Sequence, residues 1–205
     1  MLFRSRDDVN YFKFDGFAAG NNQPGAGPYR TEAEAMLRII EGLRRLKPGV
    51  FVNATTGTWP SPFWLLWADS IWRQGRDSDV AGKGSDRQQW ISYRDAQVLH
   101  GTLERSPLYP ISSLMIHGVL VTRFPFKGNW LDPKAQVPTL APKDLADEIR
   151  SFFACGVNCQ EMYVQTKLMP PAAWDVLAEA ALWSRANTDV LADTHWIGGD
   201  PLKNE

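Results

Sequence analysis

Short apolar stretches that read as strands alternate with helical stretches five times along this chain. This alternation is typical of a parallel sheet whose strands are joined by crossover helices. The predicted strands span residues 9–14, 50–54, 68–72, 111–121 and 161–168. The predicted helices span residues 31–47, 60–66, 87–104, 145–156 and 170–182. The sequence therefore predicts an α/β fold.

The positions of the polar residues favour a barrel over an open sheet. The glycine-rich phosphate turn of many open sheets is missing after the first strand. Polar residues instead follow the first three strands, at Asp15, 53–58 and 73–79, and barrel enzymes build their sites at such strand ends. A complete (β/α)8 barrel takes about 250 residues. Five units therefore predict a partial TIM barrel with an open edge, and hence an isolated chain of low stability and little activity.

Composition excludes several classes of protein. The 205 residues suffice for one domain, and 44% of them are apolar, as in a globular protein. A net charge of −1 argues against binding of nucleic acid by bulk electrostatics. No apolar run approaches the roughly 20 residues of a membrane span. The two cysteines, Cys155 and Cys159, are expected to be buried thiols, and no metal site is predicted around them.

Lys13 and Asp15 form the first candidate motif, in the stretch YFKFDGF. The two side chains share one face of the strand because side chains alternate with period two. A cation at this distance favours the ionised carboxylate that a nucleophile requires. The alternative interpretation is a salt bridge at the end of the strand.

The stretch DSIWRQGRDSD carries the second motif, with Arg73 ending a strand and Asp77 following in the loop. Carboxylates from neighbouring strand ends can flank a glycosidic bond, one attacking the anomeric carbon and the other protonating the leaving oxygen. In retaining enzymes the two groups lie about 5 Å apart. Asp-Ser-Asp is also common in solvated turns, and the sequence does not choose between Asp77 and Asp79.

Together the two motifs resemble the alpha-galactosidase and alpha-N-acetylgalactosaminidase families. Lys-x-Asp ends a barrel strand in those families, and Trp-Arg follows two strands later with Asp four residues after the Arg. The resemblance implies that Asp15 is the nucleophile and Asp77 the acid/base. It also implies that Lys13 orients the sugar and that Arg73 contacts a sugar hydroxyl.

The resemblance also has consequences for the whole chain. It implies that residues 1–187 supply strands four to eight of the catalytic barrel, and that residues 188–205 begin a following β domain or linker. It implies a carbohydrate substrate, no cofactor, and an exported parent protein whose signal would lie upstream. Gly16 and Phe17 replace the Asn or Asn-Cys common in the family, and the segment 53–64 lacks its cysteine-containing sugar-recognition pattern. We therefore expect a branch distinct from standard alpha-galactosidases, whose sugar the sequence leaves open.

Aromatic residues are the remaining candidates. Nine tryptophans are unusual, and flat indole rings can stack on sugars. Trp59, Trp64 and Trp72 are candidate sugar platforms, with packing at the barrel rim as the alternative. His117 is expected to be a core histidine, and Glu161, Tyr163, Gln165 and Lys167 share one face of the last strand.

Two other functions stay open at this stage. One is a carbohydrate-binding barrel that has lost hydrolysis. The other is a metal-dependent hydrolase that uses Asp15, His117 and Asp193 as ligands. The oligomeric state is not predicted.

Overall fold

The computed structural model describes residues 9–15, 27–55, 59–123 and 138–203. Within these ranges five strands form one parallel sheet in the order in which they occur along the chain. They are β1 (Tyr11–Phe14), β2 (Phe51–Ala54), β3 (Ser70–Trp72), β4 (Leu114–Val121) and β5 (Cys159–Val164). The predicted α/β fold is confirmed, and the described residues contain five parallel strands.

Helical segments follow each strand, as predicted. They are α2 (Glu32–Leu46), η1 (Pro62–Leu66), α3 (Asp86–Val98), η2 (Leu99–Leu103), η3 (Ile111–Ser113), α4 (Pro142–Ala154), α5 (Pro171–Ala186) and α6 (Thr188–Ala192). Local sequence fixes several helix starts. The Thr31 hydroxyl accepts a hydrogen bond from the Glu34 amide at 3.1 Å, and Ser85 and Gln88 form a capping box.

All five strands are shorter than the sequence predicts, and the ends of β4 and β5 show the reason. Residues 111–113 form the 3₁₀ helix η3 instead of the start of β4. β5 ends at Val164, and the Leu168 amide donates to the Gln165 carbonyl at 2.8 Å in a turn. Apolar or alternating residues alone do not mark these ends, because turns can carry the same residue types as strands.

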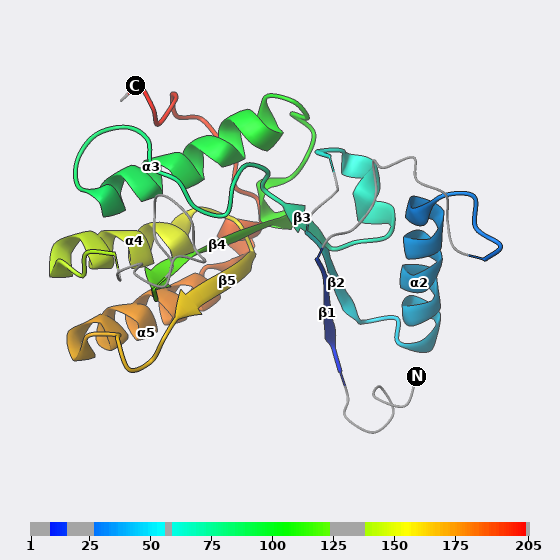
Figure 1. Cartoon of the computed structure of the whole chain (residues 1–205), viewed down its shortest axis with the longest axis horizontal. Helices are drawn as coiled ribbons and strands as arrows, with labels where there is room; N and C mark the ends of the chain where they lie inside the picture. The colour runs from blue at the N-terminus through cyan, green and yellow to red at the C-terminus, as the bar shows by residue number, and fades with distance from the viewer. Residues whose placement is uncertain (1–8, 16–26, 56–58, 124–137, 204–205) are drawn as a thin grey trace.

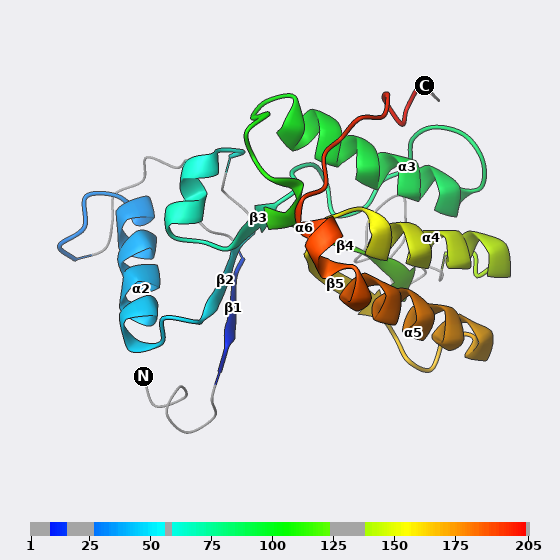
Figure 2. The same cartoon turned by 180° about the vertical axis from the view of Figure 1, so that it is seen from behind.

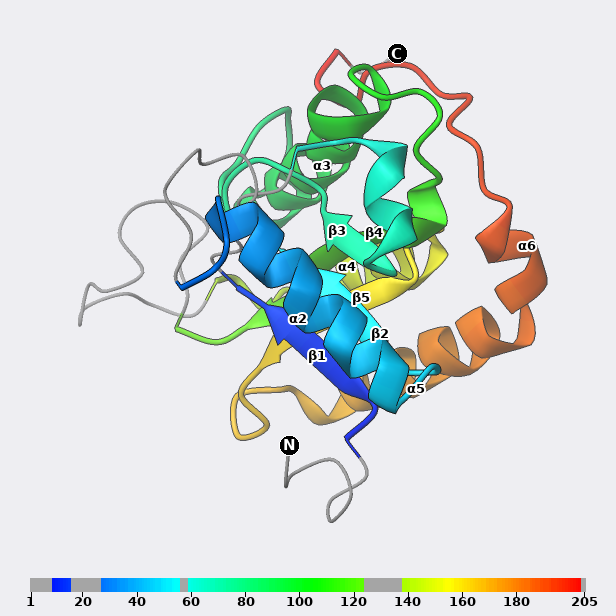
Figure 3. The same ribbon diagram turned by 90° about the vertical axis from the view of Figure 1, so that its right-hand side faces the viewer.

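The sheet curls into a half-barrel with its helices outside. Figure 1 and Figure 2 show α2 beside β1 and β2, and α4 and α5 beside β4 and β5. Figure 3 shows the strands running between these helices. The curl brings β1 and β5 close enough for Lys13 and Glu161 to form an ion pair. This architecture is compatible with the predicted partial barrel.

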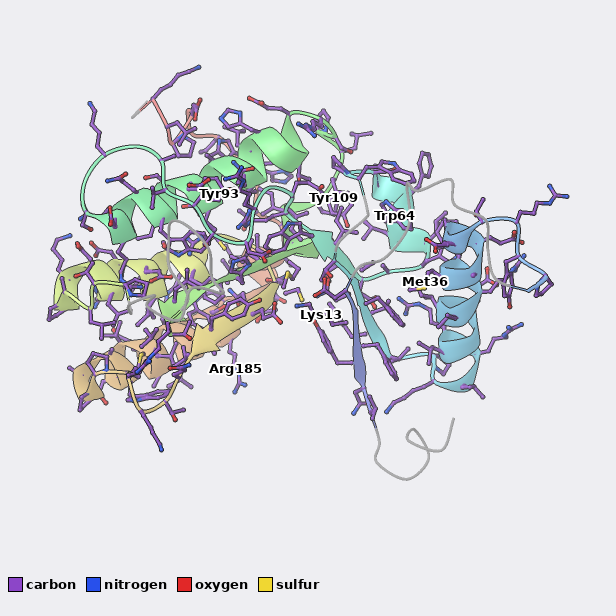
Figure 4. All side chains as sticks on the ribbon, viewed as in Figure 1. Lys13, Met36, Trp64, Tyr93, Tyr109 and Arg185 are labelled. Carbon is purple, nitrogen blue, oxygen red and sulfur yellow. The ribbon has the colours of Figure 1, made fainter. Side chains whose placement is uncertain are left out.

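The two faces of the sheet differ in chemistry. The outward face is apolar and packs against the helices through residues such as Val52, Ile71 and Ile116. Figure 4 shows Met36 on the side of α2 that faces the sheet, and Lys13 between β1 and β5. The inward face carries polar side chains at alternate positions, including Lys13, Asn53, Ser70, His117 and Glu161. Candidate chemistry therefore lies on the inward face.

A bulge near the end of β4 is held by a buried ion pair. The register shifts between Gly118 and Val121, and Val119 has a φ of 53°, which β-branched residues rarely adopt. The buried Glu148 carboxylate accepts from the Leu120 amide at 3.1 Å, and Arg87 donates to the Leu120 carbonyl at 3.1 Å. Arg87 and Glu148 also pair directly. The pair therefore satisfies main-chain groups that the bulge leaves without ladder partners.

Three further observations bear on the compositional predictions. Cys155 and Cys159 are free thiols, the former partly and the latter fully buried. No helix in the described ranges is both long and apolar enough to span a bilayer. Beyond α5, the described residues contain helix α6, whose Leu191 is buried, and a set of turns.

Candidate functional site

Asp15 follows β1 directly and is held by the end of β2. The Thr55 hydroxyl lies 3.1 Å from the Asp15 Oδ1 atom and 3.1 Å from the Phe14 carbonyl oxygen. The Thr55 amide also donates to the Phe14 carbonyl at 3.1 Å. Asp15 itself is exposed at the carboxyl end of the strand. The contact with Thr55 orients the Asp15 carboxylate at the end of β1.

Lys13 and Glu161 form an ion pair across the inward face. The Lys13 Nζ atom lies 2.9 Å from each carboxylate oxygen of Glu161. The Tyr163 hydroxyl donates to Glu161 Oε2 at 3.3 Å. The sequence predicted that Lys13 orients a sugar, and the structure adds Glu161 as the group that holds the ammonium in place.

A neutral hydrogen-bonded layer lies beneath this ion pair. The Asn53 amide donates to the Tyr11 hydroxyl at 2.9 Å, and the Ser70 hydroxyl donates to Asn53 Oδ1 at 3.0 Å. Tyr11 Oη also lies 3.7 Å from Cys159 Sγ. Burial raises the pKa of Tyr11 to about 12, so the phenol stays protonated at neutral pH. The inward face beneath the ion pair is therefore lined by neutral side chains that are hydrogen-bonded to one another.

Side chains anchor the loop after β3 at each of its first carbonyl groups. Arg73 donates to the Gln74 carbonyl at 2.7 Å and to the Arg76 carbonyl at 3.0 Å. The Trp72 indole donates to the Gly75 carbonyl at 3.3 Å. These bonds fix the backbone of residues 74–76 on the buried aromatic cluster below.

Two more side chains complete this anchoring. The Arg76 amide donates to the Tyr93 hydroxyl at 2.8 Å. The imidazole Nε2 of His117 is hydrogen-bonded to the Asp77 carbonyl oxygen. Four consecutive carbonyls, from 74 to 77, therefore accept hydrogen bonds from side chains. A loop held in this way is pre-organised before any ligand arrives.

The Arg73 guanidinium is enclosed within the protein. Its carbon lies 4.4 Å from the Trp72 ring centroid, and the rings of Trp90 and Tyr93 lie within 6 Å. Burial lowers the pKa of Arg73 to about 10, so the group remains charged at neutral pH. Its hydrogen bonds go to the loop carbonyls, and a contact with a sugar hydroxyl remains a prediction.

The structure distinguishes Asp77 from Asp79. The Asp79 carboxylate accepts from the Val80 amide at 2.9 Å and from Arg76 at 3.4 Å, as in the turn chemistry that the sequence suggested. The Asp77 side chain is exposed, and its carboxylate makes no hydrogen bond to the described part of the chain. Asp77 is therefore the more accessible carboxyl group of the two.

Tyr163 lies within the electrostatic influence of both candidate carboxylates. Burial raises the pKa of Tyr163, and the negative charges of Glu161, Asp77 and Asp15 raise it further. Asp15 follows β1 and Asp77 lies in the loop after β3, so both belong to the edge formed by the carboxyl ends of the parallel strands.

The three candidate tryptophans occupy different environments. Trp59 is 50% exposed, and its ring meets the ring of Trp64 edge to face at a centroid distance of 5.2 Å. Trp64 and Trp72 are 6% and 7% exposed, so both rings are covered by protein. Only the ring of Trp59 among these three presents a broad surface to solvent, and sugar stacking remains a prediction for all of them.

The proposed metal ligands are not brought together. Among the described residues, no group of three or more His, Cys, Asp or Glu side chains could hold a metal ion. Asp193 instead lies beside His195, at 3.2 Å. His117 is buried among aromatic rings, as expected for a core histidine.

A well-formed groove lies elsewhere in the fold. It has a volume of about 510 Å³ and lies where residues 103–111 meet residues 192–196. Its lining is mostly apolar, and it contains neither of the candidate carboxylates. Parallel barrels place their chemistry at the carboxyl ends of the strands, so Asp15 and Asp77 remain the candidate site.

Sequence reasoning identified some supporting residues and missed others. The period-two pattern of β5 indicated Glu161 and Tyr163. Thr55, Trp90 and Tyr93 were not identified as site residues. Trp90 and Tyr93 lie three residues apart on α3, which is a helical face, but nothing in that spacing shows that the face covers the loop after β3.

No protein-family model matches this sequence, and no curated protein matches it. The site is therefore interpreted from its geometry and from the motif resemblance.

Proposed function

We propose that this chain is a retaining alpha-glycosidase that acts on galactose-configured or related sugars. Its half-barrel corresponds, in this proposal, to strands four to eight of a (β/α)8 barrel. The observation that carries the proposal is that two exposed carboxylates, Asp15 and Asp77, follow β1 and β3 at the carboxyl ends of the parallel sheet. Two such carboxylates are the minimum machinery of glycoside hydrolysis.

The proposed reaction has two steps. In the first, Asp15 forms a bond to the anomeric carbon while the glycosidic bond breaks and Asp77 transfers its proton to the leaving oxygen. In the second, Asp77 accepts a proton from water, and the resulting hydroxide breaks the glycosyl ester and releases Asp15. Neither step requires a metal or an organic cofactor.

Neighbouring groups support these roles. Thr55 donates to the Asp15 carboxylate and keeps it oriented on the end of β1. Lys13, held by Glu161, is positioned to donate to a sugar hydroxyl from the inward face. The exposed ring of Trp59 offers a surface for the sugar or for the group attached to it.

Covalent labelling tests the proposal. The 205-residue chain is incubated with a galactose-configured cyclitol epoxide, and intact mass is followed by peptide mapping. We expect one adduct, on Asp15, that a competing free sugar suppresses. Because an adduct accumulates with time, labelling detects even a site that turns over slowly.

Asp15→Asn is the matched control, and it should give no adduct. An adduct on another carboxylate would refute the assignment of the nucleophile. Absence of any adduct, together with binding of galactosides by Asp15→Asn and wild type alike, would favour a carbohydrate-binding barrel instead. Probes of other configurations then show whether only the choice of sugar was wrong.

A further inference from the structure

The loop after β3 is also held at Asp77, through the main chain of that residue. Arg73, Trp72 and Tyr93 anchor residues 74–76. In the described part of the chain, the main chain of Asp77 is held by His117, whose Nε2 contacts the Asp77 carbonyl oxygen. His117 lies on β4, next to β3 in the sheet, and is 40 residues away in sequence.

The imidazole ring is immobilised by the rings around it. Its centroid lies 5.0 Å from the Trp72 ring at an interplanar angle of 4°. The Trp90 ring lies at 5.6 Å, and the Tyr163 ring meets the imidazole edge-on at 5.0 Å. His117 is 1% exposed. A ring packed in this way holds its Nε2 atom at one place relative to the sheet.

The hydrogen bond also fixes the tautomer. A carbonyl oxygen can only accept, so Nε2 must carry the hydrogen. Burial lowers the pKa of His117 well below its ordinary value, and the cations Arg73, Arg94 and Lys13 lower it further. The histidine is therefore neutral at neutral pH and acts as a hydrogen-bond donor without charge.

We propose that His117 is a positioning residue for the acid/base carboxylate: its Nε2–H group holds the Asp77 carbonyl and so sets the place from which the Asp77 side chain reaches the leaving oxygen. The inference rests on the proposed function, because it assigns His117 a part in that reaction. It gives a catalytic reason for a buried polar ring in β4, where an apolar side chain would also fill the space.

Two substitutions separate the hydrogen bond from the packing. His117→Phe keeps a flat ring but removes the donor. His117→Gln places an amide N–H near the position of Nε2 and can restore the bond. Tyr109→Phe is the matched control, since it removes another buried donor, from the Tyr109 hydroxyl to the Ser113 carbonyl at 3.3 Å, away from the site.

Amide hydrogen exchange measures the loop independently of activity. We expect His117→Phe to speed exchange in the peptide covering residues 74–80 by about tenfold, the effect of losing one hydrogen bond worth about 1.4 kcal/mol. His117→Gln should recover most of the protection, and Tyr109→Phe should leave this peptide unchanged. Equal exchange in wild type and His117→Phe would overturn the proposal, provided that circular dichroism shows both to be folded.

Kinetics test the catalytic consequence. A misplacement of about 1 Å can cost roughly 100-fold in rate. We expect His117→Phe to lower kcat/KM by 10- to 100-fold for an alkyl glycoside, whose leaving group needs a proton. For an activated aryl glycoside the loss should be less than about threefold, because that leaving group needs little acid assistance. Equal losses on both substrates would contradict a positioning role.

The labelling experiment distinguishes failure of this inference from failure of the proposed function. If wild type forms the Asp15 adduct and His117→Phe changes neither exchange nor substrate preference, the inference alone fails. If wild type forms no adduct and hydrolyses neither glycoside, the proposed function and the catalytic role of His117 fail together. The exchange measurement then decides only whether His117 holds the loop.

Discussion

The Lys13 ammonium lies 2.9 Å from both carboxylate oxygens of Glu161, although 148 positions separate the two residues in sequence. Lys13 belongs to β1 and Glu161 to β5, the two outermost strands of the sheet as described. The ion pair therefore spans the inward face and joins the two ends of the curled sheet.

Breaking this ion pair should affect activity more than stability. Lys13 and Glu161 are 27% and 34% exposed, and pairs that solvent reaches contribute less than about 1 kcal/mol. We expect Glu161→Gln to lower kcat/KM by about tenfold or more, because the Lys13 ammonium loses its fixed place. Thermal unfolding and steady-state kinetics measure the two effects. Glu41→Gln, which breaks the exposed Arg38–Glu41 pair on α2, should change neither.

The acid/base assignment predicts different results at Asp77 and Asp79. Asp77→Asn should lower kcat/KM for an alkyl glycoside by about 100- to 10,000-fold, the usual contribution of general acid catalysis. Added azide should restore turnover of an activated aryl glycoside and give a glycosyl azide of retained configuration. Asp79→Asn keeps a side-chain acceptor for the Val80 amide and should stay within about threefold of wild type, since it lies outside the chemistry. A larger loss of kcat/KM for Asp79→Asn than for Asp77→Asn would assign the acid/base role to Asp79.

Gly101 is expected to be essential for the anchoring of the β3 loop. A Cβ atom there would lie 2.8 Å from the Arg73 carbonyl oxygen, a main-chain atom that cannot easily move. We expect Gly101→Ala to destabilise the fold by about 1–3 kcal/mol, as overpacking does. Gly42→Ala is the control, because Gly42 lies within α2 and has no atom within 4 Å of its built Cβ. That change should stabilise the protein by about 0.5–1 kcal/mol. Chemical denaturation measures the change in stability for each substitution. Equal effects of the two substitutions would contradict the close approach of Gly101 to the Arg73 carbonyl.

His117 and His100 should have opposite effects on stability as pH falls. Burial lowers the pKa of His117, so below pH 6.5 the unfolded chain binds a proton that the folded chain resists. His117 thus favours folding above that pH, and stability should fall below it with a limiting slope of about 1.4 kcal/mol per pH unit. His117→Gln should lack this slope in denaturation measured between pH 7.5 and 5.

The pKa of His100 is raised by its hydrogen bonds to Glu104 and Asp200. Its contribution to stability is complete below pH 6.5 and is lost as pH rises through its folded pKa. His100→Gln should therefore lower the melting temperature at pH 6 more than at pH 8. Titration of the carboxylates affects both variants in the same way. The difference between the two variants therefore reports on the histidines alone. The same pH dependence of stability in both variants would contradict pKa shifts of opposite sign at His117 and His100.

Local sequence determined the elements of this fold and its candidate motifs. Periodicity predicted five strand–helix units, because it acts within a few residues. The caps at Thr31 and Ser85, which the structure shows, act over the same short range. Position after a strand marked Asp15 and Asp77, because parallel strands bring their carboxyl ends to one edge.

The tertiary structure decided which groups meet. Glu161 pairs with Lys13 only because the sheet curls, and Trp90 and Tyr93 cover the loop after β3 only because α3 packs there. The bond from His117 to Asp77 likewise depends on the pairing of β3 with β4. Sequence periodicity shows which face of an element is buried. Which partner that face meets depends on the curl and packing of segments far apart in the chain, and no local pattern records these.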